Sequence, residues 1–188
     1  MPNWTSNRIY IEGDQPDIRA FLQAVKWEDE LFDFNRIIPM PDILKRTGSG
    51  HREIDGKRVE SWYIVKPWHS DFPGQKEQVR LFTPEEEAEL ETIGCRDWYG
   101  WALANWGTKW NAGRVEIDDT SINYGSIEII FETAWSAPIL VLVRMREMFP
   151  ALTFDCRWRY EDESPYPNSL DDFAGGSATA LRAKAGAA

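Results

Sequence analysis

Two segments that each combine strand-like and helix-like patterns, one near each end of the chain, limit this sequence to few folds. Residues 8–12 alternate apolar and polar side chains and stop at Gly13, which predicts a strand with one buried face. Residues 16–27 then place apolar side chains at helical spacing, after Asp14 as a capping residue and Pro16 in the first turn. The amino-terminal segment is therefore expected to form a strand followed by an amphipathic helix.

The carboxyl-terminal half shows the same two periodicities. Residues 115–119 and 126–132 alternate on either side of a turn-like segment, which predicts an antiparallel pair of strands. Ser136 stands at a helix-cap position before residues 137–149, which have helical spacing. Residues 152–160 alternate strictly and predict a last strand.

The predicted order is strand, helix, strand, strand, helix, strand, the order of the ferredoxin-like split βαβ fold. We therefore expect an α+β protein with a four-stranded antiparallel sheet and both helices on one face. Residues 28–111, between the first helix and the second strand, are too many for a bare loop and predict a helical, aromatic-rich insertion. The expected domain is 1–162 with this inserted subdomain, followed by a mostly disordered tail, 163–188, rich in Pro, Gly, Ala and Ser.

Inside the insertion, glycines and polar residues over 45–57 predict a mobile loop. Thr83, Pro84 and Glu86 form a capping-box pattern, which predicts a helix start. A second helix is expected over 97–106, with Gly107 in position to end it.

Charge and composition narrow the function classes. The chain holds 21 Lys and Arg against 31 Asp and Glu, a net charge of −10, which opposes binding to nucleic acid or anionic membrane. Two cysteines and two histidines are too few for a disulfide framework or a soft-metal site, so we expect no metal and no cofactor. No apolar run is long enough for a membrane span and no signal peptide is visible, so the cytoplasm is the expected compartment. The sequence specifies no oligomeric state.

Four stretches of the chain resemble the YubB-like ferredoxin-fold family, a domain of unknown function carried by plasmids, phages and genomic islands. They are Met-Pro-Asn-Trp4 with Asn7 and Gly13, Phe34-Asn-Arg-Ile-Ile-Pro-Met-Pro41, the segment 97–110 that ends in Asn-Trp-Gly-Thr-Lys-Trp110, and Phe131-Glu-Thr-Ala-Trp-Ser-Ala-Pro138. The resemblance implies the ferredoxin-like fold with an insertion and no established activity. The sequence departs from the family at Thr5, where cysteine is expected, and in its glycine-rich tail.

The ten tryptophans indicate either an aromatic-rich core or an aromatic contact surface. Lys109 or Arg96 is positioned to act as a cation–π partner for a cluster within the insertion: Trp98, Trp101, Trp106 and Trp110. The alternative is a buried core that joins the insertion to the sheet. As candidate ligand- or partner-binding residues the sequence indicates Asn35, Arg36, Trp101, Asn105, Trp106, Thr108, Lys109 and Trp110.

Other chemistry-bearing residues have simpler interpretations. The glycines at 48 and 50 suggest an anion-binding nest or, more simply, a flexible loop. His51 and His69 are the only two histidines, and we predict no catalytic residue. Cys156 is expected to be buried, and Cys95 precedes a predicted helix, where a thiolate is favoured. The acidic pair Asp118-Asp119 is more simply a solvated surface than a metal site.

Two functions remain open. The first is a non-enzymatic protein-interaction module of a mobile genetic element, one version being an inhibitor of a host defence protein, with a host or element-encoded protein as partner. The alternative is a small-ligand or nucleotide-binding domain, with a pocket between sheet and insertion. Single-stranded nucleic-acid binding is third, because the acidic charge opposes contacts to phosphate.

Overall fold

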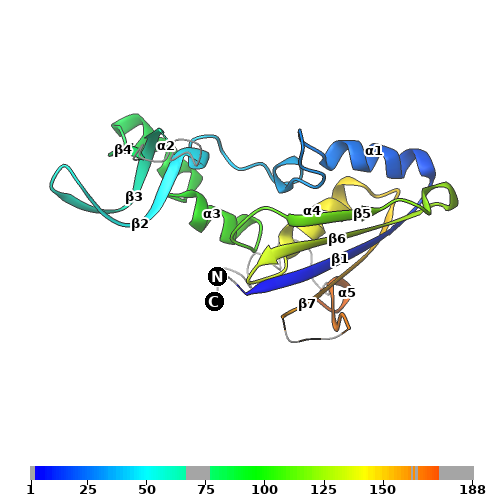
Figure 1. Cartoon of the computed structure of the whole chain (residues 1–188). Coiled ribbons are helices and arrows are strands. Elements are labelled where there is room, and N and C mark those ends of the chain that lie inside the picture. Colours follow the sequence, from blue (N-terminus) through cyan, green and yellow to red (C-terminus); the bar gives the residue numbers. More distant parts are fainter. Residues whose placement is uncertain (1–2, 67–76, 162, 164, 174–188) are drawn as a thin grey trace. The chain divides into compact units, whose positions relative to one another are not determined.

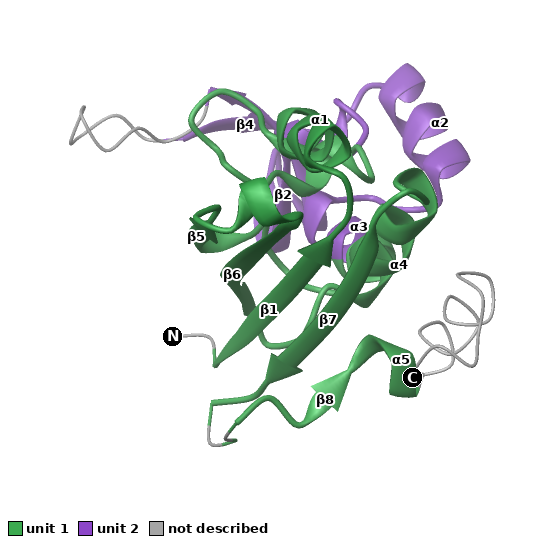
Figure 2. Cartoon of the chain, turned by 90° about the vertical axis from the view of Figure 1, so that its right-hand side faces the viewer, with its two compact units in different colours: residues 1–39, 103–188 green, residues 40–102 purple. Residues whose placement is uncertain are grey.

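A five-stranded antiparallel sheet forms around the first strand, β1 (Trp4–Glu12), in a computed structural model that describes residues 3–66, 77–161, 163 and 165–173. The strand order is β5-β6-β1-β7-β8 (Figures 1 and 2). The other strands are β5 (Gly113–Asp118), β6 (Ser126–Ala134), β7 (Thr153–Arg159) and β8 (Asn168–Ser169). Strand β1 pairs with β6 on one side and with β7 on the other, so the centre of the sheet is formed by residues far apart in the sequence.

One face of this five-stranded sheet carries the buried hydrophobic side chains. Its alternating buried side chains include Ile9 and Ile11 of β1 and Ile129 of β6. Two helices lie on the same side of the sheet, α1 (Gln15–Val25) and α4 (Ile139–Met148) (Figure 1). Phe21 of α1 packs against Phe154 of β7 with ring centroids 5.6 Å apart. Arg146 of α4 donates a 2.5 Å hydrogen bond to the Phe154 carbonyl. The opposite face of the sheet carries polar and charged side chains.

The antiparallel α+β architecture agrees with the sequence, but the expected four-stranded layout is wrong in detail. The extra strand β8 and the short helix α5 (Leu170–Phe173) lie in the segment predicted to be mostly disordered. They form because Asn168 and Ser169 pair with β7 and Leu170 is fully buried. The rest of the predicted tail, 174–188, lies outside the described residues.

The chain divides into two compact units (Figure 2). The first contains residues 1–39 and 103–188, and the second is Met40–Ala102. The second unit is shorter at both ends than the insertion predicted over 28–111. Asp33 and Phe34 show why: both are buried in the first unit, and Asn111 hydrogen-bonds to both residues.

The second unit has its own three-stranded sheet, in the order β2-β3-β4. Its strands are β2 (Thr47–Ile54), β3 (Lys57–Lys66) and β4 (Gln78–Arg80). The mobile loop predicted over 45–57 is wrong, because Trp62 of β3 lies directly over Gly48 of β2 and fills the space of a side chain there. Two helices follow, α2 (Pro84–Ile93) and α3 (Trp98–Asn105), and α3 ends in the first unit.

The helix starts were predicted with mixed success. The capping box of α2 is confirmed, since the Glu86 amide donates to Thr83 Oγ1 and the Glu86 carboxylate accepts from the Thr83 amide. Ser136 does not cap α4; its hydroxyl donates to the Gly107 carbonyl instead. In the described part of the chain, no helix is long and apolar enough to cross a membrane.

Candidate functional site

Three tryptophans and two cationic side chains meet at one end of the five-stranded sheet. We call this group the tryptophan corner: Trp4, Lys109, Trp110, Arg114 and Trp135. Trp4 begins β1, Trp135 directly follows β6, and the other three lie on the segment from the loop after α3 into β5. The corner forms because Trp4 pairs with Ala134 and the Trp135 amide donates to the carbonyl of the residue before Trp4, at 2.9 Å.

The side chains of the corner contact one another in the order Arg114, Trp4, Trp110, Lys109, Trp135. Lys109 Nζ lies 4.6 Å from the ring centroid of Trp110 and 4.8 Å from that of Trp135. The Trp4 and Trp110 centroids are 6.0 Å apart, and Arg114 Cζ is 5.8 Å from the Trp4 ring. Each cation is within the range at which an indole face attracts it. The corner is thus a series of contacts in which Lys109 joins the Trp110 and Trp135 rings and Arg114 contacts the Trp4 ring.

Two of the three tryptophan rings of the corner are exposed to solvent. Trp110 is 38% exposed and Trp135 is 43% exposed. Aromatic side chains with a polar edge and a nearby cation are enriched where proteins contact one another, because they bury a large area at low entropic cost. The corner has this composition.

The backbone at Trp135 is strained. Its φ of 72° lies in the left-handed region, where a bulky L-residue costs roughly 1–2 kcal/mol relative to the right-handed one. Such a conformation persists only where surrounding bonds hold it, and it is concentrated at functional sites. Here the surrounding structure holds a strained tryptophan with almost half of its surface in solvent.

Buried hydrogen bonds fix the loop that carries Lys109 and Trp110. Thr108 is fully buried, and its hydroxyl donates to the Ala134 carbonyl at 2.8 Å. On the other side, Ser136 Oγ donates to the Gly107 carbonyl at 2.5 Å. The exposed rings therefore stand on a rigid support.

The predicted site residues fall into two groups. Lys109 and Trp110 lie in the corner, and Lys109 is a cation–π partner of Trp110, one of the four tryptophans predicted to form a cluster. The ring contacts do not match that cluster, because Trp110 contacts Trp4, Trp106 contacts Phe34, and Trp98 contacts Tyr99. The alternative partner, Arg96, contacts Phe82 instead. Sequence reasoning missed Trp4 and Trp135 as site residues, because β-sheet register, not sequence proximity, brings them to Lys109.

The remaining predicted residues have structural roles or lie elsewhere. Thr108 is buried, as described above, and is not available to a ligand. Trp106 is also buried, and its indole Nε1 donates to the Ile38 carbonyl at 2.9 Å. Trp101 is buried on the part of α3 that belongs to the second unit, and Asn105 is the last residue of that helix.

Asn35 and Arg36 lie on a short 3-10 turn after α1. The Asn35 amide and side chain both donate to Asp33 Oδ1, at 2.9 and 3.0 Å. Arg36 donates to the Ala24 carbonyl and stacks over Trp27 at 5.3 Å. Asp33, which the sequence did not indicate, is 5% exposed and organises this turn.

Other sequence candidates do not form a reactive site in the described residues. Burial and the Asp97 charge raise the pKa of Cys95, which contradicts the expected thiolate. Burial raises the pKa of Cys156 to about 12. Gly48 lies on a strand beneath Trp62 and not in an anion-binding nest. His51 is exposed, whereas His69 lies outside the described residues.

Acidic clusters were the remaining metal-site candidates. Asp118 Oδ1 accepts from the amide and hydroxyl of Thr120, which lowers the pKa of this carboxylate. Across the residues with described positions, no group of three or more His, Cys, Asp or Glu side chains is arranged to hold a metal ion.

Comparison with known proteins supports the fold. Residues 105–166 match the family model described as a ferredoxin-like domain in Api92-like protein. The match spans β5, β6, α4 and β7 and includes every corner residue except Trp4. A search of curated proteins and a search of solved structures found no match. This part of the chain is therefore similar to a ferredoxin-like domain of unknown function.

Proposed function

We propose that the chain is a non-enzymatic protein-interaction module and that the tryptophan corner is its contact surface. The observation that carries the proposal is the strained, exposed Trp135, held beside Lys109 and a second exposed tryptophan. Trp135 keeps an unfavourable backbone conformation although 43% of its surface is exposed to solvent. Selection for contact with another molecule is a direct reason to keep it.

The resemblance to the YubB-like family supports the biological setting of the proposal. We place the protein in a plasmid, phage or genomic island, acting in the cytoplasm on a host or element-encoded protein. One concrete version is inhibition of a host defence protein that handles nucleic acid. The net charge of −10 favours fast association with a basic partner, which such proteins often are.

The experiment is capture of partners from host lysate with the tagged full chain, followed by quantitative mass spectrometry. The test variant carries Trp110→Ala and Trp135→Ala. The matched control is Trp27→Ala, because Trp27 is also an exposed tryptophan, 52% accessible, with a stacked arginine 5.3 Å away. We expect one stoichiometric protein bound to the wild type and the control but lost from the corner variant.

Two results contradict the proposal. Capture of the same partner by the corner variant at the wild-type level shows that the contact surface lies elsewhere. Capture of no protein by the wild type from hosts that carry such elements removes the interaction function itself.

A further inference from the structure

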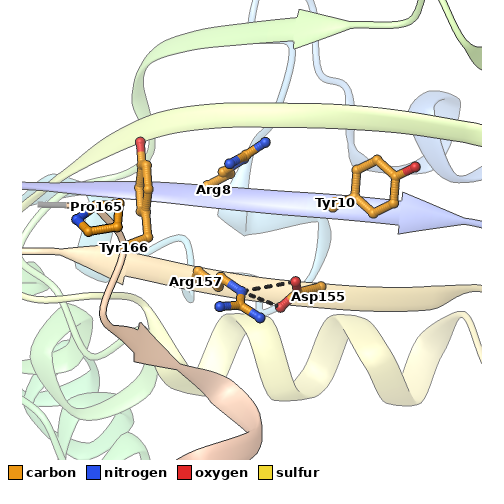
Figure 3. Close-up of a pocket in the computed structure, with 6 residues that line it drawn as sticks. All are labelled: Arg8, Tyr10, Asp155, Arg157, Pro165 and Tyr166. Carbon is orange, nitrogen blue, oxygen red and sulfur yellow. Dashed lines mark hydrogen bonds and ion pairs between the residues drawn. The ribbon is translucent and has the colours of Figure 1, made fainter.

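The sheet face opposite α1 and α4 carries a separate hollow of about 330 Å³ (Figure 3). It lies between β1 and β7 and is closed at one end by the segment that follows β7. Its lining combines two arginines, two tyrosines, a carboxylate and a proline: Arg8, Tyr10, Asp155, Arg157, Pro165 and Tyr166. Tyr10 and Tyr166 stand toward opposite ends of the hollow with the two arginines between them (Figure 3).

The guanidinium group of Arg157 is held by its Nε atom, and the N–H groups of its terminal nitrogens are left to donate to a ligand. Its Nε donates to both Asp155 oxygens, at 3.0 and 2.9 Å, which fixes the plane of the guanidinium group. No acceptor among the described residues bonds to its two terminal nitrogens. An arginine held in this way presents a fork of N–H donors, which matches two oxygens of a phosphate or carboxylate.

The two tyrosines differ in how they are held. The Tyr166 hydroxyl is 3.0 Å from Ser6 Oγ, and Arg8 and Arg159 lie over its ring at 6.0 and 5.3 Å. Tyr10 is 39% exposed and makes no ring contact with another described residue. The Tyr166 ring is therefore part of the wall of the hollow, whereas the Tyr10 ring offers a solvent-exposed aromatic face to a ligand.

The local charge of the hollow permits an anion, although the whole chain carries −10. Arg8 is paired with Glu128, and Arg157 with Asp155, so these groups cancel. Arg159, beside Tyr166, is paired with no carboxylate in the described part of the chain. With these ion pairs the lining of the hollow is close to neutral, and its donors recognise an anion by geometry more than by net charge.

We propose that this hollow binds one nucleotide unit, with the phosphate on the terminal nitrogens of Arg157 and the base stacked on Tyr10. Base–aromatic stacking needs only a free ring face, and arginine forks are common phosphate ligands. A volume near 330 Å³ is at the lower end for ligand pockets and suits a single nucleotide. This inference rests on a different surface from the tryptophan corner and does not depend on the proposed protein partner.

The nucleotide unit has two possible sources: a free mononucleotide or one residue of a single strand. Calorimetric titration of the full chain with AMP, adenosine, inorganic phosphate and a short single-stranded oligoadenylate distinguishes them. We expect adenosine and phosphate to bind at least about tenfold more weakly than the probe that carries both groups. Oligoadenylate binding more tightly than AMP identifies a single strand as the source, and equal or tighter binding of AMP identifies the free nucleotide.

Variants connect the binding to the hollow. Tyr10→Ala and Arg157→Gln should each weaken the better of the two nucleotide probes about tenfold or more, whereas Tyr10→Phe keeps the ring and should retain binding. Matched controls are Tyr124→Ala, a 90% exposed tyrosine on a turn, and Arg144→Gln, an exposed ion-paired arginine on α4.

The proposal is overturned if neither AMP nor the oligonucleotide binds at millimolar concentration. It is equally overturned if Tyr10→Ala and Arg157→Gln bind as the wild type does. Because both side chains are solvent-accessible, the variants should fold, and thermal unfolding checks this. Should either variant fail to fold, Tyr10→Phe and Arg157→Lys replace them. Arg157→Lys keeps the charge but loses the fork of N–H donors. Retained binding by Tyr10→Phe together with weakened binding by Arg157→Lys then supports the proposal, and any other result overturns it.

Discussion

Replacing Trp135 by alanine and, separately, by glycine measures the strain at the tryptophan corner. Both substitutions remove the indole, so loss of its packing and of its contact with Lys109 is shared by the two variants. They differ because alanine keeps a Cβ in the left-handed region at φ 72°, whereas glycine adopts this conformation without penalty. The difference between them isolates the backbone contribution.

The magnitude follows from two opposing terms. Alanine in the left-handed region costs roughly 1–2 kcal/mol. Glycine has a more flexible unfolded state, which costs it roughly 0.4–1 kcal/mol relative to alanine. We therefore expect Trp135→Gly to be more stable than Trp135→Ala by up to about 1.6 kcal/mol, the reverse of the usual order.

Urea unfolding of the full chain, followed by circular dichroism, gives the free energies of unfolding. The same pair of substitutions at Trp110 is the matched control, because Trp110 is an exposed corner residue without a positive φ. There alanine should equal or exceed glycine in stability. If Trp135→Ala is more stable than Trp135→Gly by the same margin as the alanine variant over the glycine variant at Trp110, the left-handed conformation stores no strain and the reasoning about its selection fails.

Three further predictions concern the supports of the two units. Glu86→Gln should lower the free energy of unfolding at pH 7 by about 1 kcal/mol, because it weakens the bidentate pair with Arg80 and the capping box. Arg80 lowers the pKa of Glu86 below its ordinary value of 4.5. The stability that the Glu86 carboxylate contributes is therefore present above pH 4.5 and is lost as the pH falls through the lowered pKa. Urea unfolding at pH 7 and at a pH below the lowered pKa checks this prediction. Gly48→Ala should destabilise by about 1–3 kcal/mol in the same assay, since the new Cβ would overlap the indole ring of Trp62. Thr108→Val should cost about 1–2 kcal/mol by leaving a buried carbonyl unpaired.

Each of these predictions has an opposing result. An equal loss for Glu86→Gln at pH 7 and at acid pH would show that the carboxylate charge is irrelevant. A neutral Gly48→Ala would mean that the indole moves freely; Gly100→Ala, on a helix with its nearest atom 3.7 Å away, is the control and should be neutral or stabilising. A Thr108→Val variant that keeps full stability would reopen Thr108 as a ligand residue.

The first unit was largely predictable from sequence because its long strands and its two main helices have a strong local period, whereas the short β8 and α5 do not. Strands β1, β6 and β7 alternate apolar and polar residues, and one face of each is buried as expected. The hairpin β2–β3 was missed because its buried positions include Gly48 and Ser61, which carry no hydrophobic signal. Gly48 is buried because Trp62 of the next strand covers it, and the sequence around Gly48 does not indicate this contact.

The candidate site was predictable only in part. Lys109 and Trp110 are neighbours in the sequence, and their pairing follows from that proximity. Trp135 reaches Lys109 only through the register of β6, and its positive φ has no sequence signature in a tryptophan. The hollow beside Tyr10 likewise depends on which residues of β7 lie opposite β1.

The central position of β1 has a consequence for how the chain acquires its fold during synthesis. Strand β1 is made first, yet its partners, β6 and β7, are complete only at residues 134 and 159. The second unit, 40–102, is continuous in sequence and can fold while β1 still waits for both neighbours. Until then Ile9 and Ile11 stay unburied on an unpaired strand, so folding of the first unit is controlled by long-range contacts and is expected to be the slow, aggregation-sensitive step.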